Sequence, residues 1–138
     1  IGTKNFVNYM NGKAGSIGLS NTFFADSSGL SFRNVSTPED LFKLVSYIFK
    51  NKKQILDITR KKEWEEGMKK WSNGGKFSGL ENFLGGKTGY TDSAGKTFAG
   101  VFSLPSAESV PREIAIIILK SQDRDDDVIK ILDYLKNR

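Results

Sequence analysis

The residues with the clearest chemical potential lie together in one glycine-rich segment, residues 85–95, which has the sequence GGKTGYTDSAG. Lys87 and Thr88 place a fixed cation beside a hydroxyl donor, a combination suited to holding a carboxylate or a phosphate. The flanking glycines would let another backbone or a ligand approach closely. The segment therefore predicts an anion-binding element.

Three interpretations of this segment compete. A phosphate-binding P-loop needs a glycine at the position that Glu81 occupies before Gly86-Lys87-Thr88, so the spacing excludes that motif. The glycines could instead form only a tight turn. The third interpretation is the Lys-Thr-Gly strand of serine acyl-transferring enzymes, which acts together with a Ser-x-x-Lys nucleophile and a Ser-x-Asn element.

The composition limits the chemistry that remains. The 138 residues contain no histidine and no cysteine, which excludes a Ser-His-Asp triad, a cysteine nucleophile, a thiolate or imidazole metal site and a disulfide framework. Acid–base chemistry near neutral pH would then use carboxylates, Lys or Tyr with a shifted pKa, or groups from another chain. The length and the 38% hydrophobic content fit one folded domain.

Positive charge is concentrated in the middle of the chain. Residues 41–80 hold ten basic and four acidic residues, whereas the segments on either side are close to neutral. Trp64 and Trp71 interleave the basic run, so residues 50–76 could bind nucleic acid or another anionic polymer. The run is interrupted by Glu63, Glu65 and Glu66. This interruption favours a solvated, salt-bridged face and makes a nucleic-acid partner the weaker interpretation.

The elements that position the glycine-rich segment follow from periodicity. Apolar residues at helical spacing predict helices over residues 4–17, 38–50 and 125–137, with a shorter helical turn around Gln54–Ile58. The second helix has the clearest start, because Thr37 can cap it, Pro38 suits its first position and Asp40 its third.

The last third of the chain is typical of strands. Thr97–Leu104 and Arg112–Lys120 are predicted to form an antiparallel pair. Residues 20–36 are expected to form an irregular loop anchored by its aromatic side chains. A charged stretch without regular periodicity is expected to continue to about Phe83.

Three stretches occur in a specific order and at specific intervals. They are residues 6–11 (FVNYMN) with 19–30 (LSNTFFADSSGL), residues 36–41 (STPEDL), and residues 86–91 (GKTGYT) with Ala94-Gly95. Together they resemble the C-terminal part of the catalytic domain of a D-alanyl-D-alanine carboxypeptidase, a serine-type penicillin-binding protein of the β-lactamase/transpeptidase-like superfamily. The likeness covers nearly the whole chain.

The resemblance implies an α+β fold of the β-lactamase/transpeptidase-like type that is incomplete in this chain. Part of a helical subdomain would be followed by about three antiparallel strands and a C-terminal helix. Residues 1–138 would form a single, partial peptidase domain. Residues 1–83 would supply mostly the helical subdomain and connections, and residues 84–138 the strands and the C-terminal helix.

The resemblance also implies roles for four consecutive residues. Lys87 and Thr88 would bind the terminal carboxylate of a D-Ala-D-Ala peptide, or the equivalent carboxylate of a β-lactam, and Lys87 would act electrostatically on the nucleophile. Gly89 would let the substrate backbone lie along the strand. The backbone N–H of Tyr90 would form one half of the oxyanion hole. Peptidoglycan peptides and β-lactams are the implied partners, with no cofactor or metal, at an extracytoplasmic location.

The serine motifs of the family are missing from the chain. Its one Ser-x-x-Lys match, Ser93 to Lys96, follows the Lys-Thr-Gly element at once and contains a glycine, so we expect it not to be the nucleophile; no Ser-x-Asn occurs. Three explanations stay open: a fragment that lacks its N-terminal part, a second chain that supplies Ser and Lys, or a non-catalytic binding module. The first is favoured, and the chain alone is expected to be inactive.

Overall fold

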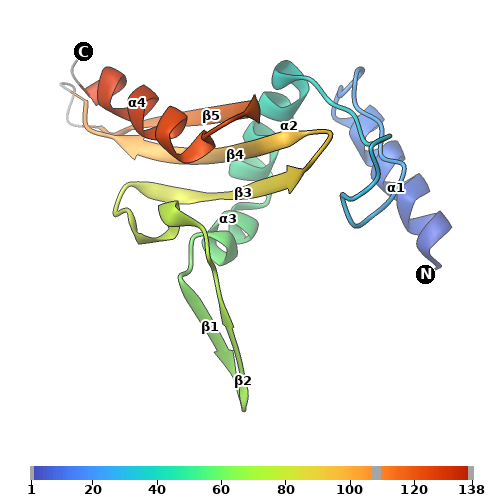
Figure 1. Ribbon diagram of the computed structural model, residues 1–138, viewed down its shortest axis with the longest axis horizontal. Helices are drawn as coiled ribbons and strands as arrows, with labels where there is room; N and C mark the ends of the chain where they lie inside the picture. Colours follow the sequence, from blue (N-terminus) through green and yellow to red (C-terminus); the bar gives the residue numbers. More distant parts are fainter. Residues whose placement is uncertain (1, 107–109, 137–138) are drawn as a thin grey trace.

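An antiparallel sheet of three strands, in the order β3-β4-β5, forms the centre of the molecule (Figure 1). The computed structural model describes residues 2–106 and 110–136. Strand β3 spans Phe83–Thr91, β4 spans Gly95–Leu104 and β5 spans Arg112–Ser121. The predicted antiparallel pair is therefore confirmed, and the glycine-rich segment forms the edge strand β3 and the turn that follows it.

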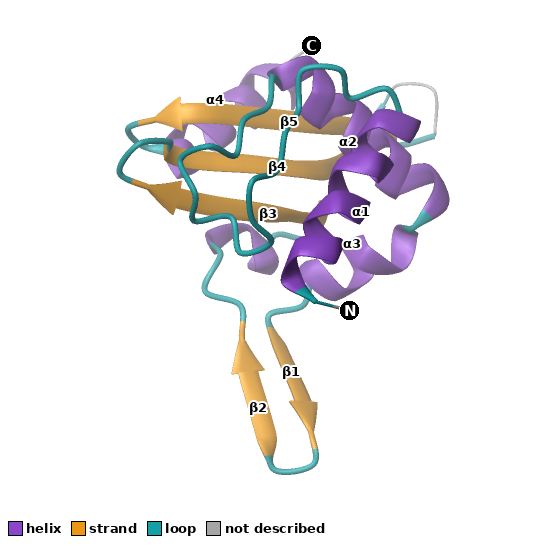
Figure 2. Ribbon diagram, turned by 90° about the vertical axis from the view of Figure 1, so that its right-hand side faces the viewer, coloured by secondary structure: helices purple, strands orange, loops and turns teal. Residues whose placement is uncertain are grey.

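Helices cover both faces of this sheet (Figure 2). On one face, Phe98, Phe102 and Ile116 pack against Val128 and Leu132 of the C-terminal helix α4, Arg124–Lys136. On the other face, helices α2 (Pro38–Asn51) and α3 (Lys53–Thr59) cover the alternate strand residues. A second, smaller core on this face contains Val45 of α2, Leu56 of α3 and Val101 of β4. Strand residues alternate between two apolar layers, as expected for a sheet that is buried on both faces.

Four phenylalanines form the centre of the larger core. Phe77 lies in the short 3-10 helix η1, Lys76–Gly79, and its ring centroid is 4.8 Å from that of Phe98. The rings of Phe83 and Phe102 complete the cluster at 5.2 Å from each other. These tilted ring contacts add to the stabilisation that comes from removing the rings from water. They connect η1 and the start of β3 to the middle of β4.

The helices begin and end close to the predicted positions. Helix α1 spans Thr3–Ser16, and α2 has the predicted cap, because the Thr37 hydroxyl accepts the backbone N–H of Asp40 at 3.2 Å. The predicted short turn is α3. For the last helix, the predicted end at residue 137 lies outside the described residues. Within the described part of the chain, no helix has the length and apolarity that a membrane crossing requires.

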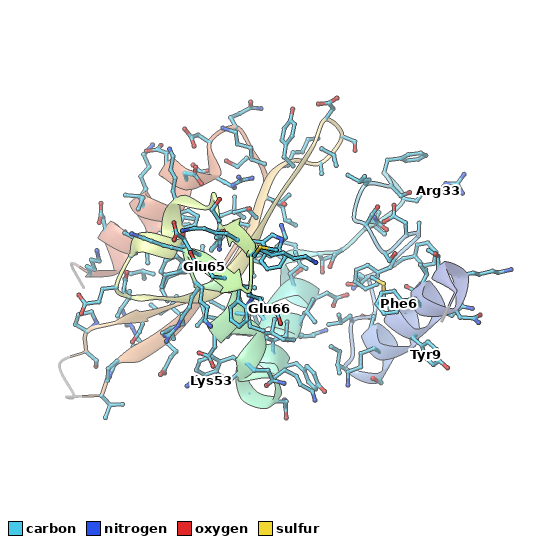
Figure 3. The ribbon with its side chains drawn as sticks, turned by 90° about the horizontal axis from the view of Figure 1, so that it is seen from below. Phe6, Tyr9, Arg33, Lys53, Glu65 and Glu66 are labelled. Carbon is cyan, nitrogen blue, oxygen red and sulfur yellow. The ribbon has the colours of Figure 1, made fainter. Side chains whose placement is uncertain are left out.

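The apolar stripe predicted for α1 is only partly buried. Ala14 is buried, whereas Phe6 is 49% and Tyr9 68% exposed, and Figure 3 shows both aromatic side chains along this outer helix. The helix is connected to α2 by the Lys13 ammonium, which donates to the Tyr47 hydroxyl at 2.7 Å. Its periodicity thus predicted the helix correctly, but not how much of the stripe is covered.

Gly85 allows α3 to lie directly against β3. Its φ is +134°, and a Cβ at this position would lie 2.5 Å from the carbonyl oxygen of Leu56 in α3. The register of β3 against β4 shifts between Phe83 and Gly85, which marks a β-bulge. The backbone that approaches this glycine is therefore the protein's own helix and not a ligand.

A two-stranded hairpin occupies part of the stretch for which no regular structure was predicted. Strands β1 (Glu63–Glu66) and β2 (Lys69–Ser72) pair antiparallel and project from the body of the molecule (Figures 1 and 2). All eight residues are exposed, so no alternation of buried and exposed positions reveals them. The available signal was Gly67, whose φ of +58° suits a tight hairpin turn.

Candidate functional site

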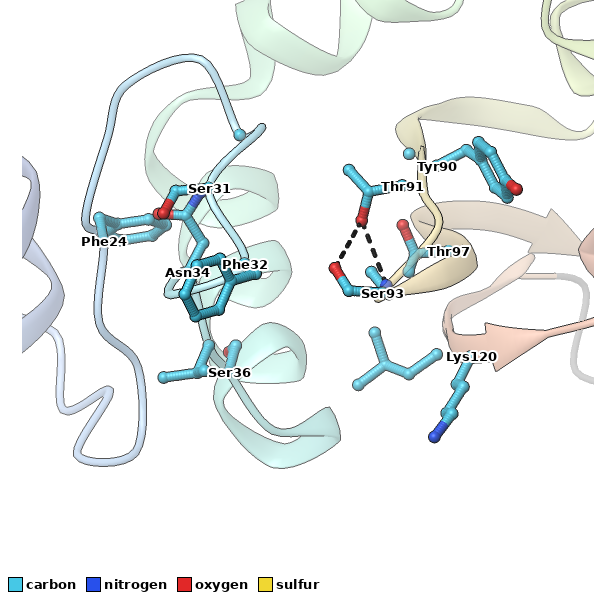
Figure 4. A pocket seen from close by; sticks show the side chains of 15 residues that line it. Phe24, Ser31, Phe32, Asn34, Ser36, Tyr90, Thr91, Ser93, Thr97 and Lys120 are labelled. Carbon is cyan, nitrogen blue, oxygen red and sulfur yellow. Dashed lines mark hydrogen bonds between the residues drawn. The ribbon is translucent and has the colours of Figure 1, made fainter.

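A cleft of about 460 Å³ separates an N-terminal loop from the end of the sheet (Figure 4). Residues 24–36 form one wall. The end of β3, the β3–β4 turn and the end of β5 form the other. The lining of the cleft includes Phe24, Phe32, Asn34, Gly89, Tyr90 and Ser93. The cleft thus brings together residues about sixty positions apart in the sequence, including two of the four predicted site residues.

Asp26 and Asn34 hold the loop wall in shape. The Asp26 carboxylate accepts the backbone N–H of Gly29 at 2.7 Å and that of Ser31 at 2.6 Å, and the Asn34 amide donates to it at 3.2 Å. Partial desolvation raises the pKa of the Asp26 carboxyl, but these hydrogen bonds outweigh it and lower the pKa below its ordinary value. The Asp26 carboxylate therefore orders the loop, because the backbone N–H groups of the loop donate hydrogen bonds to it.

Asp40 ties the same loop to α2. This fully buried carboxylate accepts the backbone N–H of Asn21 at 2.7 Å, the Thr22 hydroxyl at 2.9 Å and the Lys43 ammonium at 3.2 Å. Desolvation raises the pKa of Asp40, but the three donors reverse the effect and the net pKa is lowered. A buried charge with this many partners is compatible with a stable fold.

The expectation that aromatic side chains anchor the loop holds only for Phe24, which is partly buried and lines an apolar cavity with Phe6 of α1. Phe23 is 51% and Phe32 is 75% exposed, so neither is fixed by burial among the described residues. Polar contacts add to the anchor: the Asn11 side chain donates to the Phe24 carbonyl at 2.7 Å and accepts the Phe24 N–H at 2.8 Å. The sequence signal was Asn11 itself. An asparagine inside a helix is not at a capping position, so its amide can bind a different segment of the chain.

The four predicted site residues lie in succession on the edge strand and face two cavities. Gly89 and Tyr90 line the large cleft. Lys87 and Thr88 line a smaller cavity of about 140 Å³, whose other wall includes Thr59 of α3. The sequence identified all four as neighbours, but the contribution of α3 depends on tertiary packing.

Lys87 presents its charge at the open edge of the sheet. Its ammonium donates to the carbonyl of Thr88, and the ion pairs among the described residues do not include it. The lysine is exposed. An uncompensated cation beside the Thr88 hydroxyl is suited to an anionic ligand.

The backbone N–H of Tyr90 points away from β4. In a strand, successive residues direct their N–H groups to opposite sides. The Gly86 N–H donates to the Thr59 hydroxyl at 3.1 Å, so it points to the edge where α3 lies. The register is continuous from Gly85 to Thr91, and Tyr90 therefore directs its N–H to the same open edge.

The Tyr90 side chain does not contribute to the cleft chemistry. Its hydroxyl donates to Asp92 at 3.0 Å, and the ring is turned away from the loop (Figure 4). The hydrogen bond to the Asp92 carboxylate and the negative charge of that group raise the pKa of Tyr90 above its ordinary value. The phenol stays protonated near neutral pH, so the backbone is the useful part of this residue.

Gly89 permits close packing between β3 and β4. A Cβ on Gly89 would lie 2.6 Å from the Thr97 hydroxyl oxygen. Because that oxygen belongs to a side chain that can rotate, the glycine is needed less strictly here than at Gly85. Its carbonyl accepts a hydrogen bond of 2.7 Å from Arg124, a residue that sequence reasoning did not single out.

The single Ser-x-x-Lys match has no helical geometry. Ser93 lies in the β3–β4 turn, and Lys96 lies on β4 opposite Tyr90. The Ser93 hydroxyl is 3.3 Å from that of Thr91, the contact drawn in Figure 4. A lysine one helical turn beyond a serine would share its face, whereas these two residues are separated by the turn.

The basic segment proposed as a polymer-binding surface, residues 50–76, includes the exposed β1–β2 hairpin, in which Lys70 is salt-bridged. The Lys70 ammonium lies 2.9 Å from both Glu63 and Glu65, and Lys61 lies over the ring of Trp64 at 4.1 Å. Figure 3 labels Glu65, a residue of this exposed hairpin. These pairings match the solvated face that the interrupting glutamates indicate.

The three aspartates in the first turn of α4 each have their own partners. Asp127 accepts the Ser121 hydroxyl at 2.6 Å, Asp126 pairs with Lys130 at 2.6 Å, and Asp125 lies between Lys76 and Arg124. Among the described residues, no three His, Cys, Asp or Glu side chains form a possible metal site. These aspartates serve the start of the helix.

Comparison with known proteins identifies relatives by sequence and by structure. A family model described as D-alanyl-D-alanine carboxypeptidase matches residues 2–117. The chain is 47% identical over 59 residues to a D-alanyl-D-alanine endopeptidase of Haemophilus influenzae, an alignment that covers 43% of the chain and 20% of that protein. It is 52% identical over 44 residues to the Escherichia coli D-alanyl-D-alanine endopeptidase, covering 32% of the chain and 14% of that protein.

A solved structure extends the likeness to the whole fold. The cefotaxime-bound form of penicillin-binding protein D2 from Listeria monocytogenes superposes with a TM-score of 0.80 at 27% identity. That match covers 97% of the chain and 56% of the Listeria protein. The chain therefore spans little more than half the length of this structural relative and a smaller share of the two curated proteins.

Proposed function

The chain belongs to the family of D-alanyl-D-alanine carboxypeptidases, and we propose that the protein removes the terminal D-alanine from peptidoglycan stem peptides. In the proposed reaction, a serine of a Ser-x-x-Lys element outside these 138 residues attacks the D-Ala-D-Ala carbonyl. Terminal D-alanine leaves, and water hydrolyses the acyl-enzyme. A lysine acts as the base in place of histidine, which the chain lacks. Because peptidoglycan is the proposed substrate, we place the protein outside the cytoplasmic membrane.

The open edge of β3 carries this proposal. Lys87 holds a cation there that is unpaired among the described ion pairs, with the Thr88 hydroxyl beside it. Together they suit the terminal carboxylate of the substrate. Two positions along, Tyr90 directs its N–H to the same edge. A carbonyl oxygen that accepts this N–H would have its developing negative charge stabilised.

β-Lactams are the proposed inhibitors at the same edge. The Listeria relatives are described as cefotaxime-bound and ampicillin-bound forms. A β-lactam carries a carboxylate near its reactive carbonyl, so the arrangement proposed for the peptide also suits the drug. Lys87 and Thr88 would then hold the carboxylate, and Tyr90 would hold the carbonyl oxygen.

The test uses the full-length gene product. Fluorescent penicillin should label the wild-type protein covalently at one serine, and D-alanine should be released from a peptide ending in D-Ala-D-Ala. Lys87→Ala should lower the second-order acylation rate by about a hundredfold, because a carboxylate–ammonium contact in the transition state is lost. Lys69→Ala removes an exposed lysine of β2 and is the matched control.

Two results would contradict the proposal. A full-length protein that takes up no penicillin and releases no D-alanine would favour the non-catalytic binding module. Cleavage of cross-linked dimers without release of terminal D-alanine would replace the carboxypeptidase by an endopeptidase, the activity named for the two curated relatives.

A further inference from the structure

Gly89 and Tyr90 share one peptide group that connects the two sides of β3. The trans peptide points the Gly89 carbonyl and the Tyr90 N–H in opposite directions. Because the N–H is directed to the open edge, the carbonyl is directed toward β4. Any group that binds this carbonyl therefore influences the Tyr90 N–H through the shared amide, from the side of the strand that faces β4.

Arg124 is one such group, in addition to Thr97, the β4 residue opposite Gly89 in the strand register. The Nη1 of Arg124 donates to the Gly89 carbonyl oxygen at 2.7 Å, across a sequence separation of 35 residues. Its side chain is only 20% exposed, and its Nε, buried from solvent, makes no hydrogen bond to any of the described residues. A desolvated guanidinium aimed at one backbone carbonyl is a strong, charge-assisted contact.

We propose that Arg124 is a positioning residue that orients and polarises the Gly89–Tyr90 peptide, so that the Tyr90 N–H serves as an oxyanion-hole donor. The inference rests on the proposed acyl-transfer function. The positive charge draws electron density toward the Gly89 oxygen, which makes the N–H of the same amide a stronger donor. Donors in such sites act through being held in place before charge develops.

The surroundings of Arg124 hold its guanidinium in this direction. Asp125 lies 3.5 Å from the Arg124 Nε and 3.6 Å from the Lys76 ammonium, with its side chain 24% exposed. The start of α4 is in turn attached to β5 by the Ser121 hydroxyl, which donates to Asp127 at 2.6 Å. The arginine therefore projects from a fixed helix start and not from a loose loop.

A second arginine, on the sheet itself, provides a matched comparison for Arg124 of α4. Arg112 of β5 also donates to a backbone carbonyl, that of Leu135 in α4, but at 3.4 Å and in an exposed position. Arg112→Met removes an arginine-to-carbonyl contact between the sheet and α4 without changing the peptide at Gly89. Arg124→Met removes the contact that the proposal concerns. The two variants separate a general loss of packing from an effect on one peptide group.

The first measurement observes the peptide itself in the full-length protein. Gly89-Tyr90 is the only Gly-Tyr pair in the 138 residues, so glycine labelled at its carbonyl and nitrogen-labelled tyrosine mark this bond, and Tyr90→Phe identifies its signal. Arg124→Met should move the Gly89 carbonyl resonance upfield and shift the Tyr90 amide proton. Arg112→Met should move neither. Unchanged Gly89 and Tyr90 resonances in Arg124→Met would overturn the inference.

The second measurement observes the reaction. Arg124→Met should slow acylation by a β-lactam roughly tenfold, with the noncovalent affinity for the drug nearly unchanged. The infrared stretching frequency of the acyl carbonyl should rise, because the hydrogen bond to its oxygen is weaker. Arg124→Lys keeps a charged donor and should recover part of the rate. A milder variant, Asp125→Asn, should show the same changes at smaller size if the methionine variant fails to fold.

The outcomes separate the two proposals. A wild-type protein that no β-lactam acylates would overturn the proposed function and the role of Arg124 with it. A wild type that is acylated, with Arg124→Met acylated at the same rate and with the same carbonyl frequency, would overturn the role of Arg124 alone. Loss of thermal stability without either change would assign the arginine to packing.

Discussion

The buried carboxylate of Asp40 accepts a hydrogen bond of 2.7 Å from the backbone N–H of Asn21. This contact joins the first turn of α2 to the segment that continues into the cleft wall. Helix α2 itself packs on the sheet that contains β3. The position of the loop relative to the Lys87–Tyr90 edge is therefore set through a helix start, a buried acid and the core.

We expect Asp40 to make stability depend on acid pH. Its pKa is lowered in the folded protein, so its contribution is present above the unfolded carboxyl pKa, about 3.9, and is lost as the pH falls through the folded value. Asp40→Asn should lower the melting temperature at neutral pH and weaken its fall between neutral and acid pH. Asp57→Asn, at an exposed side chain, is the control. An unchanged acid dependence in Asp40→Asn would contradict this assignment.

The cap of α2 should be measurable on its own. Thr37→Ala removes the acceptor for the Asp40 N–H and should lower the free energy of unfolding by about 1 kcal/mol. Thr37→Ser keeps the hydroxyl and should restore most of it. Equal urea midpoints for the alanine variant and the wild type would show that the cap contributes nothing.

Gly85→Ala should destabilise the protein strongly. The new methyl group would collide with the Leu56 backbone, and the φ of +134° is strained for any L-residue with a side chain, so we expect a loss of about 3 kcal/mol or more. Gly12→Ala, on exposed α1 where nothing lies within 4 Å of the added methyl, should instead stabilise by up to about 1 kcal/mol. Chemical denaturation of both variants tests the contrast.

Phe98→Ala should cost several kcal/mol of unfolding free energy, because Phe98 is a buried phenylalanine of β4 that faces α4. The ring is 2% exposed and contacts three other rings, and its removal leaves a cavity, for a loss of about 3–5 kcal/mol. Phe32→Ala, at a side chain 75% exposed, should change the free energy of unfolding by less than about 0.5 kcal/mol. Comparable losses in the two variants would mean that Phe32 is buried in the full-length protein.

Neutralising the hairpin lysines should leave acylation unchanged. The combined substitution of Lys61, Lys62, Lys69 and Lys70 by Gln changes four side chains that line neither of the two cavities beside Lys87–Tyr90. Penicillin labelling of the full-length protein should proceed at the wild-type rate. Loss of salt-dependent binding to an anionic polymer in this variant, together with normal polymer binding by Lys87→Ala, would instead favour the basic-surface function.

Local sequence signals predicted the helices and strands that are determined by residues close together in the chain. The cap at Thr37, the apolar stripe of α2 and the β-branched run of β5 each contain their own structural information within a few residues. The Lys87–Tyr90 motif was also visible, because consecutive residues on one strand necessarily remain neighbours. The hairpin was missed because its strands are exposed on both faces, and burial is what produces a periodic pattern.

The sequence by itself determined the helices, the strands of the three-stranded sheet, the absence of histidine and cysteine, and the order of the motif on β3. Only the tertiary structure decided that α3 approaches Gly85, that the loop wall is anchored through Asp40, and that Arg124 lies behind the Gly89–Tyr90 peptide. These contacts join residues 19 to 35 positions apart. Their partners are chosen by the packing of whole elements on the sheet, which no short stretch of sequence specifies.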